Sequence, residues 1–226
     1  MRIIEKCRLF QTLSIFAAMS AFTIFIEKLH EKLSRKLPGQ SAQLKMAPIT
    51  RLLELERNRT TELPRKSAVF VLFYPDTNKI KLILIKRAKD QTVHSGQISF
   101  PGGKYEESDK DLQATALREA HEEVGLEPEK VTLIGSLSKL YIPPSNFDVY
   151  PFVGFVTQKP LLNGNHEVER IMEIDFDELR KPETCVEKPI FHQSGKEVRV
   201  PSYSIQGEII WGATAMMISE LLEIVK

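Results

Sequence analysis

Residues 100–126 have the sequence FPGGKYEESDKDLQATALREAHEEVGL, and this stretch holds most of the recognisable chemistry of the chain. Its second half has a helix-forming composition over Leu112–Val124. Ser108 or Asp111 can cap the first turn, and Gly125 can end the helix. The apolar side chains recur at helical spacing, namely Leu112, Ala116, Leu117, Ala120 and Val124. The stretch therefore predicts an amphipathic helix that follows a glycine-containing loop.

Three glutamates gather on one face of this predicted helix. Glu119, Glu122 and Glu123 stand at i, i+3 and i+4, so their carboxylates are neighbours and repel one another. A divalent cation makes such a cluster favourable, and hard oxygen ligands suit Mg²⁺ or Mn²⁺. The glycine pair before the helix lets a backbone carbonyl, such as that of Gly103, approach the same ion. We therefore predict a metal site here, with a solvated acidic helix face as the alternative.

The regions on either side of this stretch predict an α/β (α+β) domain. Two β-rich runs, Ala68–Tyr74 and Ile80–Ile85, are separated by Pro75–Asn78, which indicates a hairpin. Further strands are predicted at Val131–Tyr141, Val149–Val156, Arg170–Phe176, Glu197–Tyr203 and Glu208–Trp211, and a closing helix at Ala213–Val225. Strands outnumber helices and do not alternate with them one for one, which favours a mixed β-sheet between helices.

The N-terminal region admits two interpretations. Residues 9–26 carry no charge and follow three basic residues, which is typical of a signal peptide or a membrane anchor. The run is, however, shorter than the ~20 predominantly apolar residues that span a bilayer, and it contains several polar side chains. From Met19 onward, apolar residues recur at helical spacing, namely Phe22, Phe25, Ile26, Leu29 and Leu33. We therefore predict an amphipathic helix on a globular body, followed by a short helix around Ile49–Arg57, with residues 1–18 as an extension of uncertain role.

Composition excludes several classes of protein. The 226 residues are 42% apolar, which is enough for one core. A net charge of +1, from 31 Lys+Arg and 30 Asp+Glu, argues against a protein that coats nucleic acid. Cys7 and Cys185 make neither a disulfide framework nor a zinc motif, which favours a reducing, cytoplasmic location.

The motif in residues 103–126 resembles the Nudix box, whose family pattern is G-x5-E-x7-R-E-U-x-E-E-x-G-U with U an apolar residue. Arg118, Glu119, Glu122 and Glu123 match the pattern. Asp109 stands at the position of the first glutamate, and eight residues rather than seven separate it from Arg118. This spacing is similar to that of one Nudix branch, the coenzyme A diphosphatases.

A second pattern upstream is similar to the signature of the same branch, L-L-T-x-R-[SA]-x3-R-x3-G-x3-F-P-G-G. Arg87, Ala88, Gly96 and the segment Phe100–Gly103 match it in register. Thr92 stands where the signature has a second arginine. With further similar segments, the resemblance covers about residues 37–222.

The resemblance implies a fold, an activity and a division of the chain. The fold would be a Nudix α/β/α sandwich, with N-terminal helices and a connecting segment over residues 19–66 and the Nudix hydrolase domain over residues 67–226. The activity would be divalent-metal-dependent hydrolysis of the diphosphate of coenzyme A or its thioesters, giving 3′,5′-ADP and 4′-phosphopantetheine or its acyl derivative. Another nucleoside diphosphate substrate, such as ADP-ribose or an oxidised nucleotide, and a non-catalytic nucleotide-binding module remain as alternatives.

The resemblance also implies roles for individual residues of the box. Glu119, Glu122 and Glu123 would hold Mg²⁺ or Mn²⁺, together with the Gly103 carbonyl. Arg118 would fix the geometry of the box through Asp109. Glu119 or a later acid would take a proton from water, and Glu167 is the first candidate for that acid, with Glu169 as the second.

The substrate would be a small molecule, bound by residues that flank the box. Arg87, Lys86 and Lys104 can neutralise its phosphates, and Gly96 belongs to the upstream signature. Trp211 and the pair Met216-Met217 are interpreted as core or helix-packing residues. No nucleic acid or membrane partner is indicated, and a homodimer stays open.

Overall fold

The computed structural model describes residues 21–49, 51, 62–89, 94–191 and 197–226. The strands are β1 Arg65–Asp76, β2 Lys79–Arg87, β3 Ile98–Ser99, β4 Gly102–Lys104, β5 Thr132–Ser136, β6 Leu140–Ile142, β7 Phe147–Phe155, β8 Val168–Asp175, β9 Cys185–Phe191, β10 Glu197–Ile205 and β11 Glu208–Ile210. The α-helices are α2 Gln40–Gln43, α4 Leu112–Val124, α5 Phe176–Leu179 and α6 Gly212–Val225, and residues 21–33 are also helical. Short 3₁₀ turns lie at η1 Leu44–Met46, η2 Pro128–Lys130, η3 Pro143–Ser145 and η4 Pro182–Thr184.

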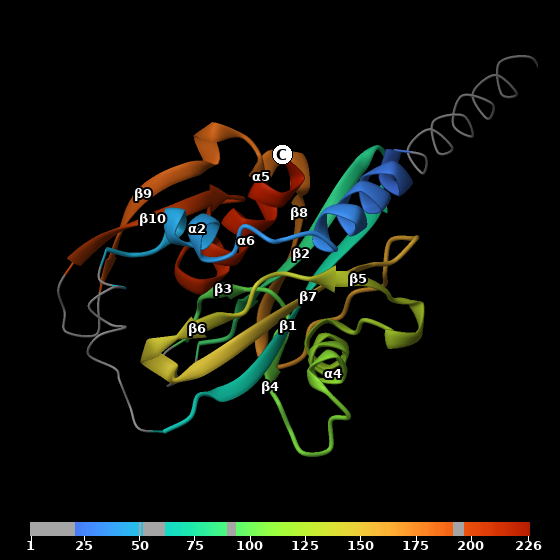
Figure 1. Ribbon diagram of the computed structural model, residues 1–226, viewed down its shortest axis with the longest axis horizontal. Coiled ribbons are helices and arrows are strands. Elements are labelled where there is room, and N and C mark those ends of the chain that lie inside the picture. Colours follow the sequence, from blue (N-terminus) through green and yellow to red (C-terminus); the bar gives the residue numbers. More distant parts are fainter. Residues whose placement is uncertain (1–20, 50, 52–61, 90–93, 192–196) are drawn as a thin grey trace, which may run out of the picture.

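A mixed sheet forms the centre of the molecule (Figure 1). Its main path runs β3-β2-β1-β7-β5, and β4, β6 and β8 pair with β1, β7 and β2. β1 and β7 are parallel, whereas the other pairs are antiparallel. The predicted hairpin is present, because Asp76 pairs with Lys79 and only Thr77 and Asn78 join β1 to β2. The predicted mixed sheet is therefore confirmed.

Helices cover both faces of this sheet. On one face, α4 packs against β1 and contributes Ala116, Ala120 and Val124 to a buried cluster. On the other face, the helix of residues 21–33 and helix α6 share a second, larger cluster with side chains of β1, β2 and β8 (Figure 1). Strands of the sheet alternate their side chains between the two clusters. This arrangement is the predicted α/β/α sandwich.

The first described helix belongs to the same core as the sheet. Phe22, Ile26, Leu29 and Leu33 are all buried, at the helical spacing seen in the sequence. Phe25 adds an edge contact, with its ring centroid 5.3 Å from that of Phe73. The predicted amphipathic helix is thus confirmed over residues 21–33, whereas residues 1–20, and most of the helix predicted at Ile49–Arg57, lie outside the described residues. Within the described part of the chain, every helix is too short or too polar to cross a membrane.

A buried carboxylate ties the N-terminal segment to the last helix. Glu220 of α6 is fully buried and accepts hydrogen bonds from the Gly39 amide at 3.0 Å and from Gln43 Nε2 at 2.9 Å. The Ser138 amide also donates to the two carboxylate oxygens of Glu220, at 3.3 and 3.2 Å. Because a buried carboxylate must have its hydrogen bonds satisfied, these donors hold the N-terminal segment and the β5–β6 connection against α6.

One predicted strand is wrong, and one feature of the sheets was not predicted. The strand predicted over Val131–Tyr141 is two strands, β5 and β6, which pair with different parts of β7. The strands near the C-terminus do not join the central sheet; β10 and β11 form a separate three-stranded sheet with β9, in the order β11-β10-β9. β9 was not predicted, because Pro189 interrupts its β pattern; as an edge strand, β9 tolerates this proline.

Candidate active site

The helix at the centre of the site is α4, and its ends are those predicted from the sequence. The Asp111 side chain accepts a hydrogen bond from the Ala114 amide at 2.8 Å, which caps the first turn. Gly125 ends the helix in the left-handed conformation, with φ 72°. Strand β4 (Gly102–Lys104) pairs with β1 and lies against α4. Strand β4, called the glycine strand below, therefore lies next to the face of α4 that carries Glu119, Glu122 and Glu123.

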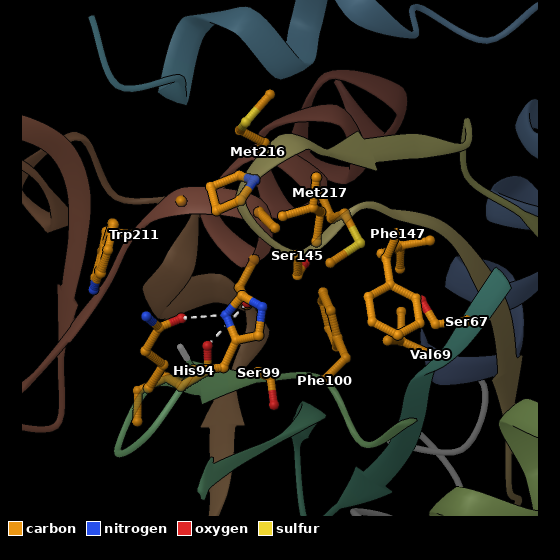
Figure 2. Close-up of a pocket in the computed structure, with 18 of the residues that line it drawn as sticks. Ser67, Val69, His94, Ser99, Phe100, Ser145, Phe147, Trp211, Met216 and Met217 are labelled. Atoms are coloured by element: carbon orange, nitrogen blue, oxygen red, sulfur yellow. Dashed lines mark hydrogen bonds between the residues drawn. The ribbon is translucent and has the colours of Figure 1, made fainter. Parts of the chain in front are cut away.

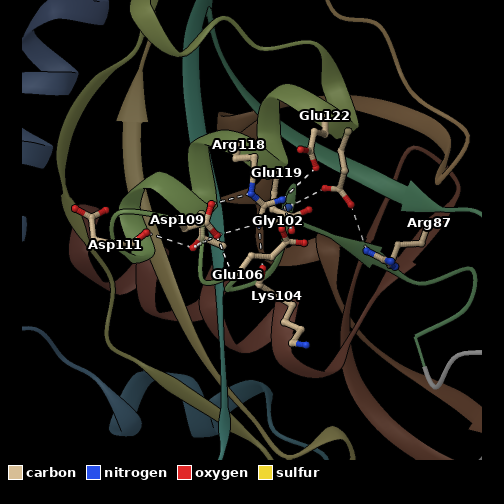
Figure 3. Close-up of polar contacts among 11 residues, drawn as sticks. Arg87, Gly102, Lys104, Glu106, Asp109, Asp111, Arg118, Glu119 and Glu122 are labelled. Atoms are coloured by element: carbon tan, nitrogen blue, oxygen red, sulfur yellow. Dashed lines mark hydrogen bonds and ion pairs between the residues drawn. The ribbon is translucent and has the colours of Figure 1, made fainter.

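Arg118 links the residues of this face (Figure 3). Its guanidinium donates from Nε and Nη2 to the two oxygens of Asp109, at 2.8 and 3.1 Å. Nη1 donates to Glu119 at 3.0 Å and to Glu122 at 3.1 Å, and Nη2 also donates to the Lys104 carbonyl at 3.1 Å. The expected contact between Arg118 and Asp109 is thus present, and a single planar guanidinium orients three carboxylates and the glycine strand.

Asp109 is the buried anchor of this arrangement. Besides Arg118, it accepts hydrogen bonds from Thr115 Oγ1 at 2.8 Å and from the Glu106 amide at 3.0 Å. The Arg118 guanidinium is the largest influence on the pKa of Asp109, which is lowered to about 2. Asp109 therefore stays ionised and holds Arg118 in place throughout the neutral range.

Glu123 points inward from α4, toward strands β2 and β4. Its side chain is only 2% exposed, and it accepts a hydrogen bond from the Gly102 amide at 2.7 Å. Arg87 Nη1 lies 3.3 Å from its other oxygen. Burial raises the pKa of Glu123 to about 7, although the Gly102 amide and Arg87 favour the ionised form. A divalent cation would relieve the cost of ionising this carboxylate.

Glu119 lies directly over the glycine strand. Burial raises its pKa, Arg118 opposes the shift, and the charges of Glu122 and Glu167 add to it. A Cβ placed on Gly103 would lie 2.6 Å from Glu119 Oε2 and closer still to Oε1. Only a glycine at position 103 leaves the Glu119 carboxylate where it is.

Glu167 is placed beside the same carboxylates. Its charge raises the pKa of both Glu119 and Glu123, so the three groups lie within electrostatic range. The Glu167 carbonyl accepts a hydrogen bond from the Ala88 amide at 2.7 Å, which joins its loop to the end of β2. Glu169, in contrast, pairs with Lys86 at 2.9 Å. Of the two candidate late acids, Glu167 is the one whose charge reaches the glutamates of α4.

The donor set fits a hard divalent cation in its chemistry. Glu119, Glu122 and Glu123 supply carboxylate oxygens, and Gly103 brings a backbone segment into contact with the first of them. In the structure, these carboxylates contact Arg118, Arg87 and the Gly102 amide. In this orientation, the described residues contain no group of three or more acidic, His or Cys side chains arranged to hold a metal ion.

A cavity of about 620 Å³ adjoins the glycine strand (Figure 2). Its lining comes from β1, β3, β4, β7, the second sheet and the start of α6. Among the described lining residues, the charged side chains are Arg51, Arg65, Arg87 and Lys104, and none of these described residues is acidic. A volume in this range is typical of small-molecule sites, which hold about 300–1,000 Å³. The cavity is therefore suited to an anionic small molecule.

Three buried side-chain atoms of the described residues lack a hydrogen-bond partner, namely Arg87 Nε, Ser99 Oγ and Ser145 Oγ. All three residues line this cavity. Ser99 pairs with Ile85, and Ile85 and Arg87 are two positions apart on β2, so Ser99 and Arg87 are diagonal neighbours on the sheet. Because buried polar groups are normally satisfied, these three side chains have unused hydrogen-bonding capacity next to the cavity.

The residues predicted to bind substrate divide into two groups. Arg87 and Lys104 line the cavity. Lys86 instead pairs with Glu169 at 2.9 Å and Glu208 at 3.2 Å, and it is not among the described lining residues. Gly96, with φ 67°, is also absent from that lining and lies in the loop between His94 and Gln97, which do line the cavity.

Several lining residues were not predicted from the sequence. Trp211 was interpreted as a core residue, but it is half-buried and lines the cavity; Met216 and Met217 are buried in the core and line it as well. Arg65 and Phe147 also line the cavity, with the guanidinium carbon 4.2 Å from the ring centroid. Sequence pattern could not identify these residues, because they come from β1, β7 and α6 and meet only in the folded chain.

Comparison with known proteins places the chain in a family. The model of the NUDIX domain matches residues 64–193. Nudix hydrolase 22, chloroplastic, and Nudix hydrolase 15, mitochondrial, both from Arabidopsis thaliana, are each 35% identical to it, over 69% and 67% of this chain. The alignments cover 53% and 55% of those proteins, so the chain spans about half the length of these relatives.

A bacterial relative is matched over most of its length. The Pectobacterium atrosepticum protein described as the uncharacterized Nudix hydrolase NudL is 31% identical over 180 residues, which are 79% of this chain and 88% of the relative. The family match covers more than half of the chain, including the glycine strand, helix α4 and Glu167. The chain therefore belongs to the Nudix family.

Proposed function

We propose that this protein is a diphosphatase, dependent on Mg²⁺ or Mn²⁺, that hydrolyses coenzyme A or its thioesters to 3′,5′-ADP and 4′-phosphopantetheine or its acyl derivative. One observation carries the proposal: the cavity reaches the glycine strand on which the Glu119 carboxylate lies, and the charged side chains among its described lining residues are all cationic. A diphosphate bound by those cations would sit next to the glutamates of α4. Residues 67–226 would form the catalytic domain, with residues 19–66 packed on it.

The choice of coenzyme A rests on the upstream signature and on the character of the cavity. Arg87, which matches the signature, lines the cavity and has a buried, unpartnered Nε. The apolar part of the lining suits an uncharged pantetheine arm. Thr92, the departure from the signature, lies outside the described residues.

Each residue of the box has a physical task in this hydrolysis. Glu119, Glu122, Glu123 and the Gly103 carbonyl would hold the ion. When bound, Mg²⁺ or Mn²⁺ stabilises negative charge on the phosphoryl oxygens and lowers the pKa of water. Arg118 orients two of these carboxylates through its contacts with Glu119 and Glu122, while Asp109 keeps the guanidinium fixed.

The bond changes follow from attack by water. The water oxygen forms a bond to one phosphorus, and the bond from that phosphorus to the bridging oxygen breaks, so the bridging oxygen leaves with the other phosphate. The proton released by water passes to a carboxylate oxygen of Glu167 or Glu119. Arg87 and Lys104 neutralise the charge of the two phosphate products.

Two other functions remain open to test. A different nucleoside diphosphate substrate, such as ADP-ribose or an oxidised nucleotide, would use the same glutamates and differ in how the cavity is filled. A non-catalytic nucleotide-binding module would retain the fold without turnover, but such a module has no physical need for repelling carboxylates beside the glycine strand.

Product analysis by mass spectrometry distinguishes these functions. The purified chain is incubated with Mg²⁺, or with Mn²⁺, and separately with coenzyme A, ADP-ribose and an oxidised nucleoside triphosphate. We expect 3′,5′-ADP and phosphopantetheine to appear fastest from coenzyme A. Faster cleavage of another substrate would retain the Nudix chemistry and reject coenzyme A, whereas no cleavage with either metal would favour the binding module.

A further inference from the structure

We propose that the apolar wall of the cavity, formed by Ile190, Val198, Val200, Trp211 and Met217, binds an apolar chain carried by the diphosphate substrate. Acyl thioesters of the substrate would then bind more tightly than the free thiol. The inference rests on the proposed function, since the wall and the predicted phosphate-binding residues belong to one cavity. It adds a second binding site to that cavity, with its own specificity.

The second sheet builds one side of this wall. Val198 of β10 pairs directly with Ile190 of β9, so the two side chains are on the same face of the sheet. Val200, two residues farther along β10, also faces this side and is only 2% exposed. All three line the cavity, and Ile190 and Val198 are half-buried. Apolar surface is therefore left accessible inside the cavity.

The other side of the wall comes from the beginning of α6. Met217 is 3% exposed and belongs to the main core, so its position is fixed. Trp211 precedes the helix and faces the same cavity; Figure 2 shows Trp211 and Met217 among the residues around it. Thr214 donates to the Ile98 carbonyl at 2.9 Å, which ties the start of α6 to β3. The wall is thus held by both the second sheet and the central sheet.

The wall is continuous with the predicted site of the diphosphate. The same cavity is lined by Gly102, Gly103 and Lys104, over which Glu119 lies. Ser145 lines it too, and its buried hydroxyl has no hydrogen-bond partner among the described residues. The order of these surfaces along the cavity therefore matches a substrate with a charged end, a polar arm and an apolar end.

The wall lies largely outside the region that defines the family. The family model ends at residue 193, whereas Val198, Val200, Trp211 and Met217 follow it. Membership of the family therefore does not imply this wall. A preference for apolar chains would be a property of the residues that follow the family match.

Fluorescence of Trp211 measures binding without turnover, because it is the only tryptophan of the chain. The full chain is titrated in EDTA with coenzyme A and with octanoyl-coenzyme A. Each buried methylene strengthens binding about fourfold, so partial burial of the chain should lower the Kd by at least about tenfold. We expect a saturable change in Trp211 emission with both ligands and this difference in Kd between them.

Two matched variants test the wall itself. Val198→Asp places a carboxylate at a half-buried position of the wall and should bring the Kd of octanoyl-coenzyme A to within about threefold of the Kd of coenzyme A measured with the same variant. Val186→Asp is the control, since Val186 is half-buried on the same face of the β9–β10 pair but is not part of the cavity lining. If Val198→Asp does not fold, Val198→Phe, which narrows the cavity, should give the same loss of preference for the octanoyl chain.

The outcomes separate this inference from the proposed function. Equal Kd values for the two ligands, or the same loss of preference in Val186→Asp, would overturn the inference. Preferential binding of octanoyl-coenzyme A without hydrolysis in Mg²⁺ would support the wall and reject the diphosphatase. Hydrolysis of both ligands without preferential binding would support the diphosphatase and reject the wall.

Discussion

Gly103 and Glu119 are packed so closely that residue 103 cannot carry a side chain without moving the carboxylate. A Cβ at position 103 would lie within 2.6 Å of Glu119 Oε2. The atoms in its way are the flexible end of a side chain, so the change would displace the carboxylate rather than the backbone. The position of a predicted metal ligand is therefore set by a glycine from another element.

This relationship predicts that Gly103→Ala lowers kcat by at least about 100-fold, because misplacement of a group by ~1 Å can cost that much. The Tm should change by only a few degrees. Gly164→Ala is a suitable control, since a Cβ there would be no nearer than 3.4 Å to a neighbouring side chain. Steady-state kinetics and thermal melts of the two variants measure this, and near wild-type kcat in Gly103→Ala would contradict it.

The low pKa of Asp109 predicts a contribution to acid stability. Its pKa is about 2 in the folded chain and 3.8 in the reference state, so the ionised form stabilises the fold above pH ~4 and this contribution is lost as the pH falls toward 2. At 1.36 kcal/mol per pKa unit, it is worth about 2 kcal/mol at pH 7. Asp109→Asn should lower the free energy of unfolding by about this amount at pH 7 and by much less at pH 2.

Denaturant unfolding at the two pH values measures the difference, with Asp111→Asn as control. Asp111 is an exposed cap, and asparagine caps a helix equally well, so that variant should differ little from wild type at either pH. A loss of stability in Asp109→Asn that is independent of pH would contradict the proposed role of the ion pair.

Arg87 and Lys86 are adjacent in sequence but have different neighbours, which predicts different effects on substrate binding. Arg87 lines the cavity and lies 3.3 Å from Glu123, whereas Lys86 is paired with Glu169 and Glu208 and does not line it. Hydrogen bonds to charged groups contribute about 1.5–3 kcal/mol, so Arg87→Ala should raise the KM about 10- to 100-fold. Lys86→Ala should change it by less than about threefold. Equal changes in the two KM values would show that position in the cavity does not decide binding.

Glu167 and Glu169 offer a similar pair for the proton acceptor. The charge of Glu167 raises the pKa of both Glu119 and Glu123, whereas Glu169 is paired with Lys86. General base catalysis contributes about 10²–10⁴-fold, so Glu167→Gln should lower kcat within that range and Glu169→Gln should leave it nearly unchanged. If Glu169→Gln were the slower variant, the roles of the two glutamates would be reversed.

Features set by neighbouring residues could be predicted from the sequence. Helix α4 has the predicted bounds, because its cap at Asp111 and its end at Gly125 are local. The β1–β2 hairpin follows from its turn residues in the same way. The contact between Arg118 and Asp109 was expected from the resemblance to the Nudix box, which carries long-range information that local pattern lacks.

Features that depend on distant parts of the chain could not be predicted. β9 contains Pro189, which argues against a strand unless the strand is known to lie at an edge. Trp211 is a large aromatic residue of the kind usually found in a core. It faces a cavity only because the second sheet packs beside α6. The pairing of Lys86 with Glu208 likewise depends on β11, which is more than a hundred residues away.

The most direct test of the central claim compares wild type with Glu122→Gln in hydrolysis of coenzyme A. Glu122 is half exposed and contributes little to stability through its contact with Arg118, so the variant should fold normally. We predict Mg²⁺-dependent release of 3′,5′-ADP and phosphopantetheine by wild type, and loss of that release in Glu122→Gln. Equal release by both proteins, or none by wild type with either Mg²⁺ or Mn²⁺, would contradict a diphosphatase whose glutamates hold the metal.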